Sequence, residues 1–470
     1  MRTFGPRQKK TGYSQNYFSE NCMSPVRKTL FVKLLLIILG SLLIGALYLL
    51  LLKALPKYAA RVPYIALLFA VDFLTYRYLS PLWRNYRNWI RASIAVIWWL
   101  PLGILLFFLF GSVFIPMPEM AKFLRIYLLG FALVFFLSKS ILLVSLIPSF
   151  ILVLIQKISA GFKRRRSYSV EIKFLKQMGL FFGSLALAGL LVGSTVWVYR
   201  FKTHRIELSI QNLPAAFEGL RIVQLSDIHL GSWLSSKPLQ KAVDQVNALN
   251  PDIIVFTGDL VNYSTSEVRG FEQVLAQLKA PLGIYTIMGN HDYGDYISWK
   301  KPEEKEANLQ QLVDFYDSLG WKLLRNESFR IEKDSASLLI AGVENWSATT
   351  RFKKYGDLYK TMENTSYADV NVLLSHDPTH WETEVSKDFT EFDITLSGHT
   401  HGMQMGIEAF GLKWSPARYL YDNWAGLASV DVPGNRRSYL YVNRGLGHIA
   451  YPGRVGILPE ITLLTLKKAD

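Results

Sequence analysis

The sequence predicts an all-α membrane module followed by an α/β domain, and three observations lead to that prediction. The first two hundred residues carry five long apolar stretches, and several of the segments between them are basic. The remainder carries short, β-rich apolar runs, several of which end in motifs of Asp, Asn and His. Charge divides at the same place, because residues 1–203 contain 26 Lys and Arg against 4 Asp and Glu, whereas residues 204–470 contain 26 against 33. We therefore predict two domains, 1–203 and 204–470.

The apolar stretches predict about five transmembrane spans, since each approaches or exceeds the ~20 residues that a membrane helix needs. They are Leu30–Leu52, Val62–Leu79, Ile94–Ile115, Phe123–Leu154 and Met178–Val198. The second is the weakest, because Asp72 and Arg77 interrupt it. The fourth is overlong, and we interpret it as one tilted or kinked span with an interfacial end.

Basic residues predict the orientation of these spans, because positively charged loops stay in the cytoplasm. The N-terminal tail and the loops after the second and fourth stretches are basic, whereas Pro116–Lys122 is nearly neutral. Five single crossings then place the α/β domain outside the cytoplasm. A hairpin within the fourth stretch would move the cluster Lys163–Arg166 outside, so we disfavour it. Lys163–Val198 also has the shape of a signal anchor, but no cleavage site closes it, and we prefer a last transmembrane helix.

The overall basicity belongs to the membrane half alone. The net charge of the chain is +15, yet residues 204–470 carry −7. Nucleic-acid binding is therefore not expected. Cys22 is the only cysteine, so an intrachain disulfide is impossible.

Five short polar motifs in the second half each follow a run that predicts a buried strand. The motifs are Asp227-Ile228-His229, Gly258-Asp259, Gly289-Asn290-His291-Asp292, Ser375-His376-Asp377 and Gly398-His399-Thr400-His401. The preceding runs are Arg221–Leu225, Asp252–Thr257, Gly283–Met288, Asn371–Leu374 and Asp393–Leu396. Loops at strand ends are where α/β proteins place their sites, so we expect these polar side chains at one edge.

The residue types in these motifs indicate a centre for two divalent metals. In Asp-x-His and His-x-His, alternate residues project to the same side of an extended backbone. A carboxylate such as that of Asp259 has two oxygens and can bridge two cations. Imidazole and carboxylate together suit Mn, Fe, Zn, Co or Ni better than Mg or Ca. Two metals ~3.5–4 Å apart can clamp a phosphate and generate hydroxide at neutral pH.

In this order the motifs resemble the calcineurin-like metallophosphoesterase family, whose signature is D-x-H, G-D, G-N-H-[DE], H and G-H-x-H. The resemblance covers about Arg205 to Lys468. It implies a four-layer α/β/β/α sandwich and two divalent metals, Mn, Fe or Zn. It also implies hydrolysis of a phosphomonoester, phosphodiester or pyrophosphate by a metal-bridging hydroxide.

The resemblance implies a role for each motif residue. Asp227, His229 and His401 would bind the first metal, Asn290, His376 and His399 the second, and Asp259 both. His291 would bind no metal; it would stabilise the developing charge or protonate the leaving group, with Asp292 orienting its ring. Asp292 and Asp377 also fit a plain role as turn or capping residues.

The end of the domain resembles the membrane-associated bacterial branch of this family. The resemblance rests on Asn443–Gly447, Gly453-Arg454 and Pro459–Ile461. That branch includes enzymes acting on phosphodiester model substrates and relatives that cleave the pyrophosphate of a UDP-linked acylated glucosamine. It implies a protein of a bacterial inner or plasma membrane. Because His204 follows the last span with almost no linker, the site should lie close to the bilayer, and a lipid-linked phosphoester is the leading substrate class. Met403 departs from the pattern, because the branch usually has glycine there.

The sequence leaves two roles open for several other residues. Arg444 could reach a substrate phosphate or pair with an acid. Tyr293, Tyr296 and Trp299 could form an apolar lip or pack within the fold. Three further histidines are expected to be structural or on the surface: His204, His380 and His448.

Two other classes of function remain open on the sequence. The first is a metal-binding scaffold or sensor without turnover, which the non-ligand pair His291 and Asp292 argues against. The second is a transporter with an enzymatic appendage, for which ionisable residues within apolar stretches are the sign: Asp72, Arg77 and Lys139. The sequence indicates no oligomeric state.

Overall fold

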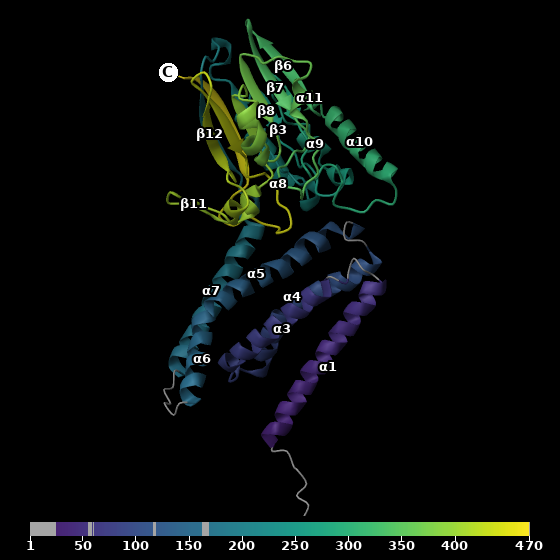
Figure 1. Cartoon of the computed structure of the whole chain (residues 1–470), viewed down its shortest axis with the longest axis vertical. Coiled ribbons are helices and arrows are strands. Elements are labelled where there is room, and N and C mark those ends of the chain that lie inside the picture. Colours follow the sequence, from purple (N-terminus) through teal and green to yellow (C-terminus); the bar gives the residue numbers. More distant parts are fainter. Residues whose placement is uncertain (1–24, 55–58, 60, 116–118, 162–168, 470) are drawn as a thin grey trace, which may run out of the picture. The chain divides into compact units, whose positions relative to one another are not determined.

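The structure is a computed structural model that describes residues 25–54, 59, 61–115, 119–161 and 169–469 (Figure 1). The chain divides into two compact units, Met1–Leu74 and Thr75–Asp470. The first unit holds helix α1 (Pro25–Ala54) and most of α3 (Arg61–Leu79). Cys22 and the basic cluster Lys163–Arg166 lie outside the described residues.

The second unit begins with apolar helices. They are α4 (Asn88–Phe114), α5 (Leu129–Ser145), α6 (Ile147–Gly161) and α7 (Ser169–Thr195). Among the described residues, four stretches are long and apolar enough to cross a membrane: Arg61–Trp83, Asn88–Ser112, Leu124–Ser145 and Val170–Tyr199. The predicted helical membrane region is thereby confirmed. The first predicted span lies within α1, and the count of about five spans stays a prediction.

The overlong fourth stretch is broken rather than continuous. A short π-helix, Leu124–Leu128, precedes α5, and α5 gives way to α6 at Leu146. The backbone N–H of Leu146 still donates to the carbonyls of Leu142 and Leu143, so the break is a local change of helix.

Two six-stranded sheets form the α/β domain. Sheet A has the order β1 (Lys202–Ile210), β14 (Glu460–Lys468), β2 (Arg221–Leu225), β3 (Ile253–Phe256), β4 (Ile284–Thr286), β5 (Lys322–Leu323). Sheet B has the order β12 (Gly426–Val432), β13 (Arg436–Val442), β9 (Ile394–Ser397), β8 (Val370–Leu374), β7 (Ala336–Gly342), β6 (Glu327–Lys333). A separate hairpin pairs β10 (Ile407–Ala409) with β11 (Leu412–Trp414).

Alternating side chains divide the core of this domain into layers. On β3, Ile254 and Phe256 pack with the helices beside sheet A. Ile253 and Val255 on the same strand pack against sheet B instead, as the two-residue period of a strand requires. The helices on sheet A are α8 (Lys237–Ala248), α9 (Glu272–Leu275) and α10 (Pro302–Ser318).

The outer face of sheet B carries its own apolar cluster, which includes Leu358 of α11 (Leu358–Met362) and Trp381. The short helix α12 (Ser386–Asp388) follows in the same segment. Helices therefore cover both outer faces of a double sheet, and the predicted four-layer α/β/β/α arrangement is confirmed.

The five strands predicted before the polar motifs all form: β2, β3, β4, β8 and β9. Within sheet A the first three run parallel, and within sheet B the last two run parallel. Their carboxyl ends meet, because the Gln224 side-chain amide donates to the Ser397 carbonyl at 2.8 Å across the two sheets. The predicted domain division between residues 203 and 204 stays a prediction, although β1 begins nearby, at Lys202.

Candidate metal centre

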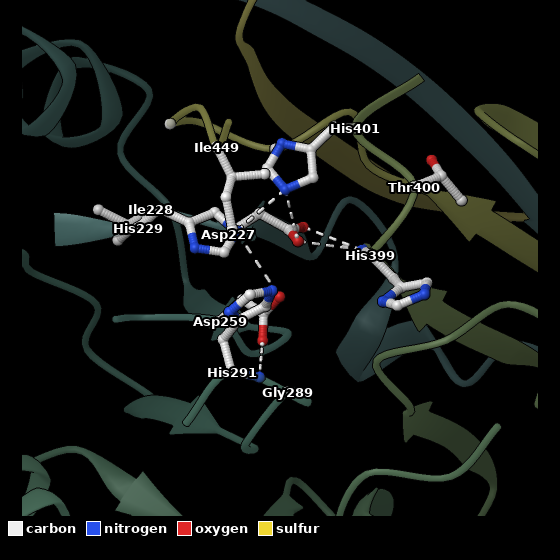
Figure 2. A network of polar contacts seen from close by, with 12 residues as sticks. Asp227, Ile228, His229, Asp259, Gly289, His291, His399, Thr400, His401 and Ile449 are labelled. Atoms are coloured by element: carbon white, nitrogen blue, oxygen red, sulfur yellow. Dashed lines mark hydrogen bonds and ion pairs between the residues drawn. The ribbon is translucent and has the colours of Figure 1, made fainter. Parts of the chain in front are cut away.

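Three of the predicted ligands form one buried group after β2 and β9 (Figure 2). The Nε2 atom of His401 lies 3.2 Å from Oδ1 of Asp227 and 3.0 Å from Nε2 of His229. The Asp227 carboxylate also accepts the backbone N–H of His399 at 3.0 Å. The structure therefore brings Asp227, His229 and His401 to one point.

A second group gathers after β3, β8 and β9. It consists of Asp259, His376 and His399, whose candidate ligand atoms lie within 4.8 Å of one another. Nε2 of His376 lies 3.2 Å from Oδ2 of Asp259 and 3.2 Å from Nδ1 of His399. These are the carboxylate and two imidazoles that the sequence groups around the second metal.

The Asp259 carboxylate connects the two groups. Its Oδ2 atom lies 3.2 Å from Nε2 of His376 and 3.6 Å from Nε2 of His229. One oxygen thus faces an imidazole of each group.

Two backbone carbonyls fix the orientation of these rings. Nδ1 of His229 lies 3.2 Å from the Val261 carbonyl oxygen, and Nδ1 of His376 lies 2.7 Å from that of Thr257. A ring whose Nδ1–H is engaged in this way presents the Nε2 lone pair on its other side, as metal-ligating histidines do.

Asn290 supplies a free acceptor. Its side-chain NH₂ donates to the Tyr296 hydroxyl at 2.7 Å, whereas its buried Oδ1 atom has no hydrogen-bond partner among the described residues. A buried acceptor of this kind calls for a partner, and a cation would be one. Two carboxylates, four imidazoles and one amide oxygen therefore fit the predicted pair of divalent metals.

Five of the seven predicted ligands adopt a left-handed backbone. The φ angles are 51° at Asp227, 50° at His229, 59° at Asp259, 71° at His399 and 50° at His401. Residues other than glycine pay ~1–3 kcal/mol for such conformations, which persist where the surrounding structure enforces them, notably at functional sites.

Opposite charges face one another in the centre. Burial opposes protonation of His376, but Asp259 beside it raises the pKa of the ring to about 10. Burial likewise opposes ionisation of Asp227, yet the neighbouring His401 ring holds the carboxyl pKa below its usual range. A cation could bind to these ionised carboxylates and imidazoles in place of the protons that the imidazoles carry.

His291 lies beside this centre. Its Nδ1 atom lies 2.7 Å from the Asn262 carbonyl oxygen, and its backbone N–H donates to Oδ1 of Asp259 at 2.9 Å. The ring stacks on Tyr296 with the centroids 4.3 Å apart. The side chain is half-buried, so one part of it remains accessible.

The sequence predicted that Asp292 would orient the His291 ring, but the Asp292 side chain makes different contacts. Its carboxylate accepts four backbone N–H groups instead, from Asp259, Leu260, Val261 and Gly289, at 2.8–3.2 Å. Burial and the Asp259 charge raise the pKa of this carboxyl to about 7. Asp292 therefore joins the loop after β3 to the loop after β4, and the Asn262 carbonyl orients His291.

Aromatic residues border the second group. The Tyr421 hydroxyl lies 3.0 Å from Nε2 of His399, and Phe352 meets that ring edge-on at 4.7 Å. Of the three aromatics considered for an apolar lip, Tyr296 contacts the Asn290 amide and the His291 ring. Tyr293 is buried against Tyr355, and Trp299 donates to a backbone carbonyl.

The sequence left two roles open for Arg444, and the structure shows the second, pairing with acidic residues. Its side chain is 3% exposed and contacts Glu460 and Glu408, each at 2.5 Å. Met403 is 40% exposed with φ of 49°, a conformation that the usual glycine adopts without strain. His380 and His448 are buried and His204 is half-buried.

Arg454 is a site residue that the sequence argument did not assign. Its guanidinium is fully buried and donates to four backbone carbonyls, those of His401, Arg444, Gly445 and Gly447. Its own backbone N–H donates to the Gly193 carbonyl of α7 at 3.1 Å. In the sequence, only the resemblance that includes the Gly453-Arg454 pair pointed to this arginine.

The family model for calcineurin-like phosphoesterase matches residues 220–403. The chain is 31% identical to a zebrafish (Danio rerio) transmembrane protein with metallophosphoesterase domain, over 56% of this chain and 57% of that protein. It is 30% identical to the UDP-2,3-diacylglucosamine pyrophosphatase LpxG of Chlamydia trachomatis, over 50% of this chain and 81% of that protein. The match spans little more than half the length of the zebrafish and cattle relatives. This chain belongs to the calcineurin-like phosphoesterase family.

Proposed function

We propose that this protein is a membrane-anchored, metal-dependent phosphoester hydrolase with a two-metal centre. The carrying observation is the position of Asp259, whose Oδ2 atom lies 3.2 Å from His376 and 3.6 Å from His229. A carboxylate between two imidazole groups suits a bridge between two cations.

The protein groups around the centre suit an in-line displacement at phosphorus. When bound, the two metals would supply Lewis-acid activation of the phosphate and of water. Asp227 and Asp259 supply the negative charge that holds cations. The Asn262 carbonyl holds Nδ1–H of His291, so a His291 imidazolium could donate its Nε2 proton to the departing oxygen and become the neutral ring.

Substitution of His291 tests the hydrolase proposal. His291→Ala should keep the metal content and lower turnover of a phosphodiester with an alkoxide leaving group by ~10²–10⁴, the usual worth of positioned proton transfer. The loss should shrink for a substrate whose leaving group needs no proton. His204→Ala, on β1, is the matched control and should keep wild-type activity. A metal-loaded wild-type protein with no turnover on any phosphoester of a panel would favour the scaffold reading.

A lipid-linked phosphoester is the substrate class that we propose. The α/β domain sits directly on the apolar helices, because the Tyr451 hydroxyl donates to the Leu190 carbonyl of α7 at 2.6 Å. A substrate anchored in the bilayer is concentrated at a site tethered this closely. LpxG, a relative at 30% identity, is named for a diacylated sugar nucleotide.

An apolar cavity supports this class. It has a volume of about 480 Å³ and lies among α4, α5 and α7, where Pro452 of the α/β domain completes its wall. Its lining includes Leu100, Ile104, Phe131, Val134 and Leu191. Pro452 belongs to the segment that continues to Arg454 and thus to the His401 loop. We propose that one acyl chain of the substrate occupies this cavity.

A chain-length series tests the acyl-chain proposal. For phosphodiesters that differ only in acyl length, kcat/KM should rise with length, whereas Val134→Trp should abolish the rise by filling the cavity. The same variant should hydrolyse a soluble phosphodiester at the wild-type rate. Equal chain-length dependence in both proteins would place the acyl chain elsewhere and leave the hydrolase proposal intact.

A further inference from the structure

Two basic residues before α5 contact loops of the metal centre. Nη2 of Arg125 lies 3.4 Å from Oε1 of Glu267. Nζ of Lys122 lies 3.5 Å from the carbonyl oxygen of Leu230, the residue after the predicted ligand His229. The apolar helices therefore contact the site at positions more than a hundred residues away in sequence.

Glu267 links Arg125 to the loop that follows Asp259. Its other oxygen, Oε2, accepts the backbone N–H of Asn262 at 2.6 Å and that of Tyr263 at 3.3 Å. The carboxylate also packs against the backbone at Gly231, where a Cβ atom would overlap it. Glu267 is 4% exposed, so its charge depends on these partners.

Asn262 connects Glu267 to His291. Its carbonyl oxygen lies 2.7 Å from Nδ1 of His291, and its side-chain amide donates to Ser232 at 2.9 Å. Arg125, Glu267, Asn262 and His291 thus form a continuous polar series from the start of the Leu124–Ser145 span to the centre. Each step is a contact between buried or half-buried groups.

We propose that Arg125 is a positioning residue for His291, acting through Glu267 and the Asn262 carbonyl. The role rests on the proposed hydrolase function, because it concerns the proton that His291 donates. Without Arg125, the buried Glu267 carboxylate would lose its ion-pair partner and keep Lys122 as its remaining cationic neighbour, which is costly. The loop Asn262–Glu267 would relax to solvate it, and the carbonyl that holds Nδ1 of His291 would move.

The test uses the full-length protein in detergent or vesicles, with Arg125→Met, Glu267→Gln and Arg125→Lys. Arg125→Met should lower kcat by about 10- to 100-fold, by analogy with the loss typical of groups that orient metal-ligating histidines. KM and the two-metal content should stay at wild-type values. Arg125→Lys should restore part of kcat. Arg87→Met, an exposed arginine between α3 and α4, is the matched control and should leave kcat unchanged.

The choice of leaving group separates positioning from general damage. A nitrophenolate departs without a proton, so Arg125→Met should lose less than about 3-fold with it while keeping the full loss with an alkoxide leaving group. Combining Arg125→Met with Glu267→Gln should cost no more than Arg125→Met alone, since both changes break the same series.

Hydrogen exchange provides a readout that needs no turnover. In metal-free Arg125→Met, the amides of Asn262 and Tyr263 should exchange faster than in the wild type, while those of β3 should not change. Unchanged exchange, or equal losses with both leaving groups, would overturn the proposed role. An inactive wild type would instead overturn the hydrolase proposal, so the two failures are distinguishable.

Discussion

At the scale of single residues, Asp259 has the most contacts with the other predicted site residues. Its two carboxylate oxygens face His376, His229 and the backbone of His291. Its backbone N–H in turn donates to Asp292 at 2.8 Å. A change here should therefore affect both metal groups rather than one.

We expect Asp259→Ala to remove both metals or to leave one loosely held. The reason is that Asp227 would be the only carboxylate left among the predicted ligands, and the second group would keep only imidazoles and the Asn290 amide oxygen. Elemental analysis of the purified variant measures the stoichiometry. Asp244→Ala, an exposed aspartate on α8, should keep the wild-type content. Two tightly bound metals per Asp259→Ala chain would contradict the bridging role.

The sequence predicted the strands and the clustered ligands, because both follow from local patterns. A buried strand such as Arg221–Leu225 shows as an apolar run, and the residues after it must emerge at its end. The orientation of His291 was not predictable in this way. It depends on the Asn262 carbonyl, and a backbone acceptor leaves no residue type in the sequence. The contact of Arg125 with Glu267, 142 residues apart, leaves no local pattern either.

At the scale of elements, the beginnings of three strands of sheet B meet at Asp393. This residue directly precedes β9, and its Oδ2 atom accepts the Asn371 backbone N–H of β8 at 2.9 Å. Arg436, the first residue of β13, lies 3.8 Å away. Burial nonetheless raises the pKa of the Asp393 carboxyl to about 6.

This raised pKa predicts how Asp393 affects stability as pH changes. A folded-state pKa above the unfolded value contributes stability that is present below about pH 4 and lost as pH rises through about 6. Asp393→Asn removes this titration and keeps an acceptor oxygen. Relative to the wild type, the variant should gain about 2–3 kcal/mol in unfolding free energy between pH 4 and pH 7.

Urea unfolding followed by tryptophan fluorescence at the two pH values measures this difference. Asp388→Asn, an exposed aspartate on α12, is the control and should change little with pH. A pH-independent difference between Asp393→Asn and the wild type would show that Asp393 is ionised at both pH values or neutral at both.

Glycines on the apolar helices let the α/β domain approach closely. A Cβ atom on Gly130 of α5 would overlap Pro452, and one on Gly193 of α7 would lie 2.6 Å from the Tyr451 hydroxyl and the Arg454 carbonyl. The segment 451–455 therefore packs against helix backbone, which only small residues permit.

At the scale of the whole molecule, two ends of the apolar helices contact the α/β domain. Arg125 lies at the start of one span and Ser194 near the end of α7, and both touch that domain. We therefore expect these positions to share one side of the membrane, as alternate crossings would require. The absolute side follows from the predicted cytoplasmic location of the basic loop between α3 and α4.

We expect the α/β domain to face away from the cytoplasm. An alkaline-phosphatase fusion after Asp470 should be active, and a fluorescent protein exported unfolded at the same position should be dark. Fusions after Arg87 should give the opposite pair of results. A bright fluorescent fusion after Asp470 would reverse the orientation and assign the substrate to the cytoplasmic leaflet.

The strand order of sheet A has a consequence for how the protein is made. β14 lies between β1 and β2, although the ribosome synthesises it after all the other described strands of the two sheets. Until Glu460–Lys468 has emerged, β1 has no hydrogen-bonded neighbour and one edge of β2 is open. Until then, Arg444 also lacks Glu460, its ion-pair partner in the folded domain. We therefore expect the metal-site loops to close only after β14 has been synthesised, and the unpaired strand edges to favour chaperone binding by the nascent chain until then.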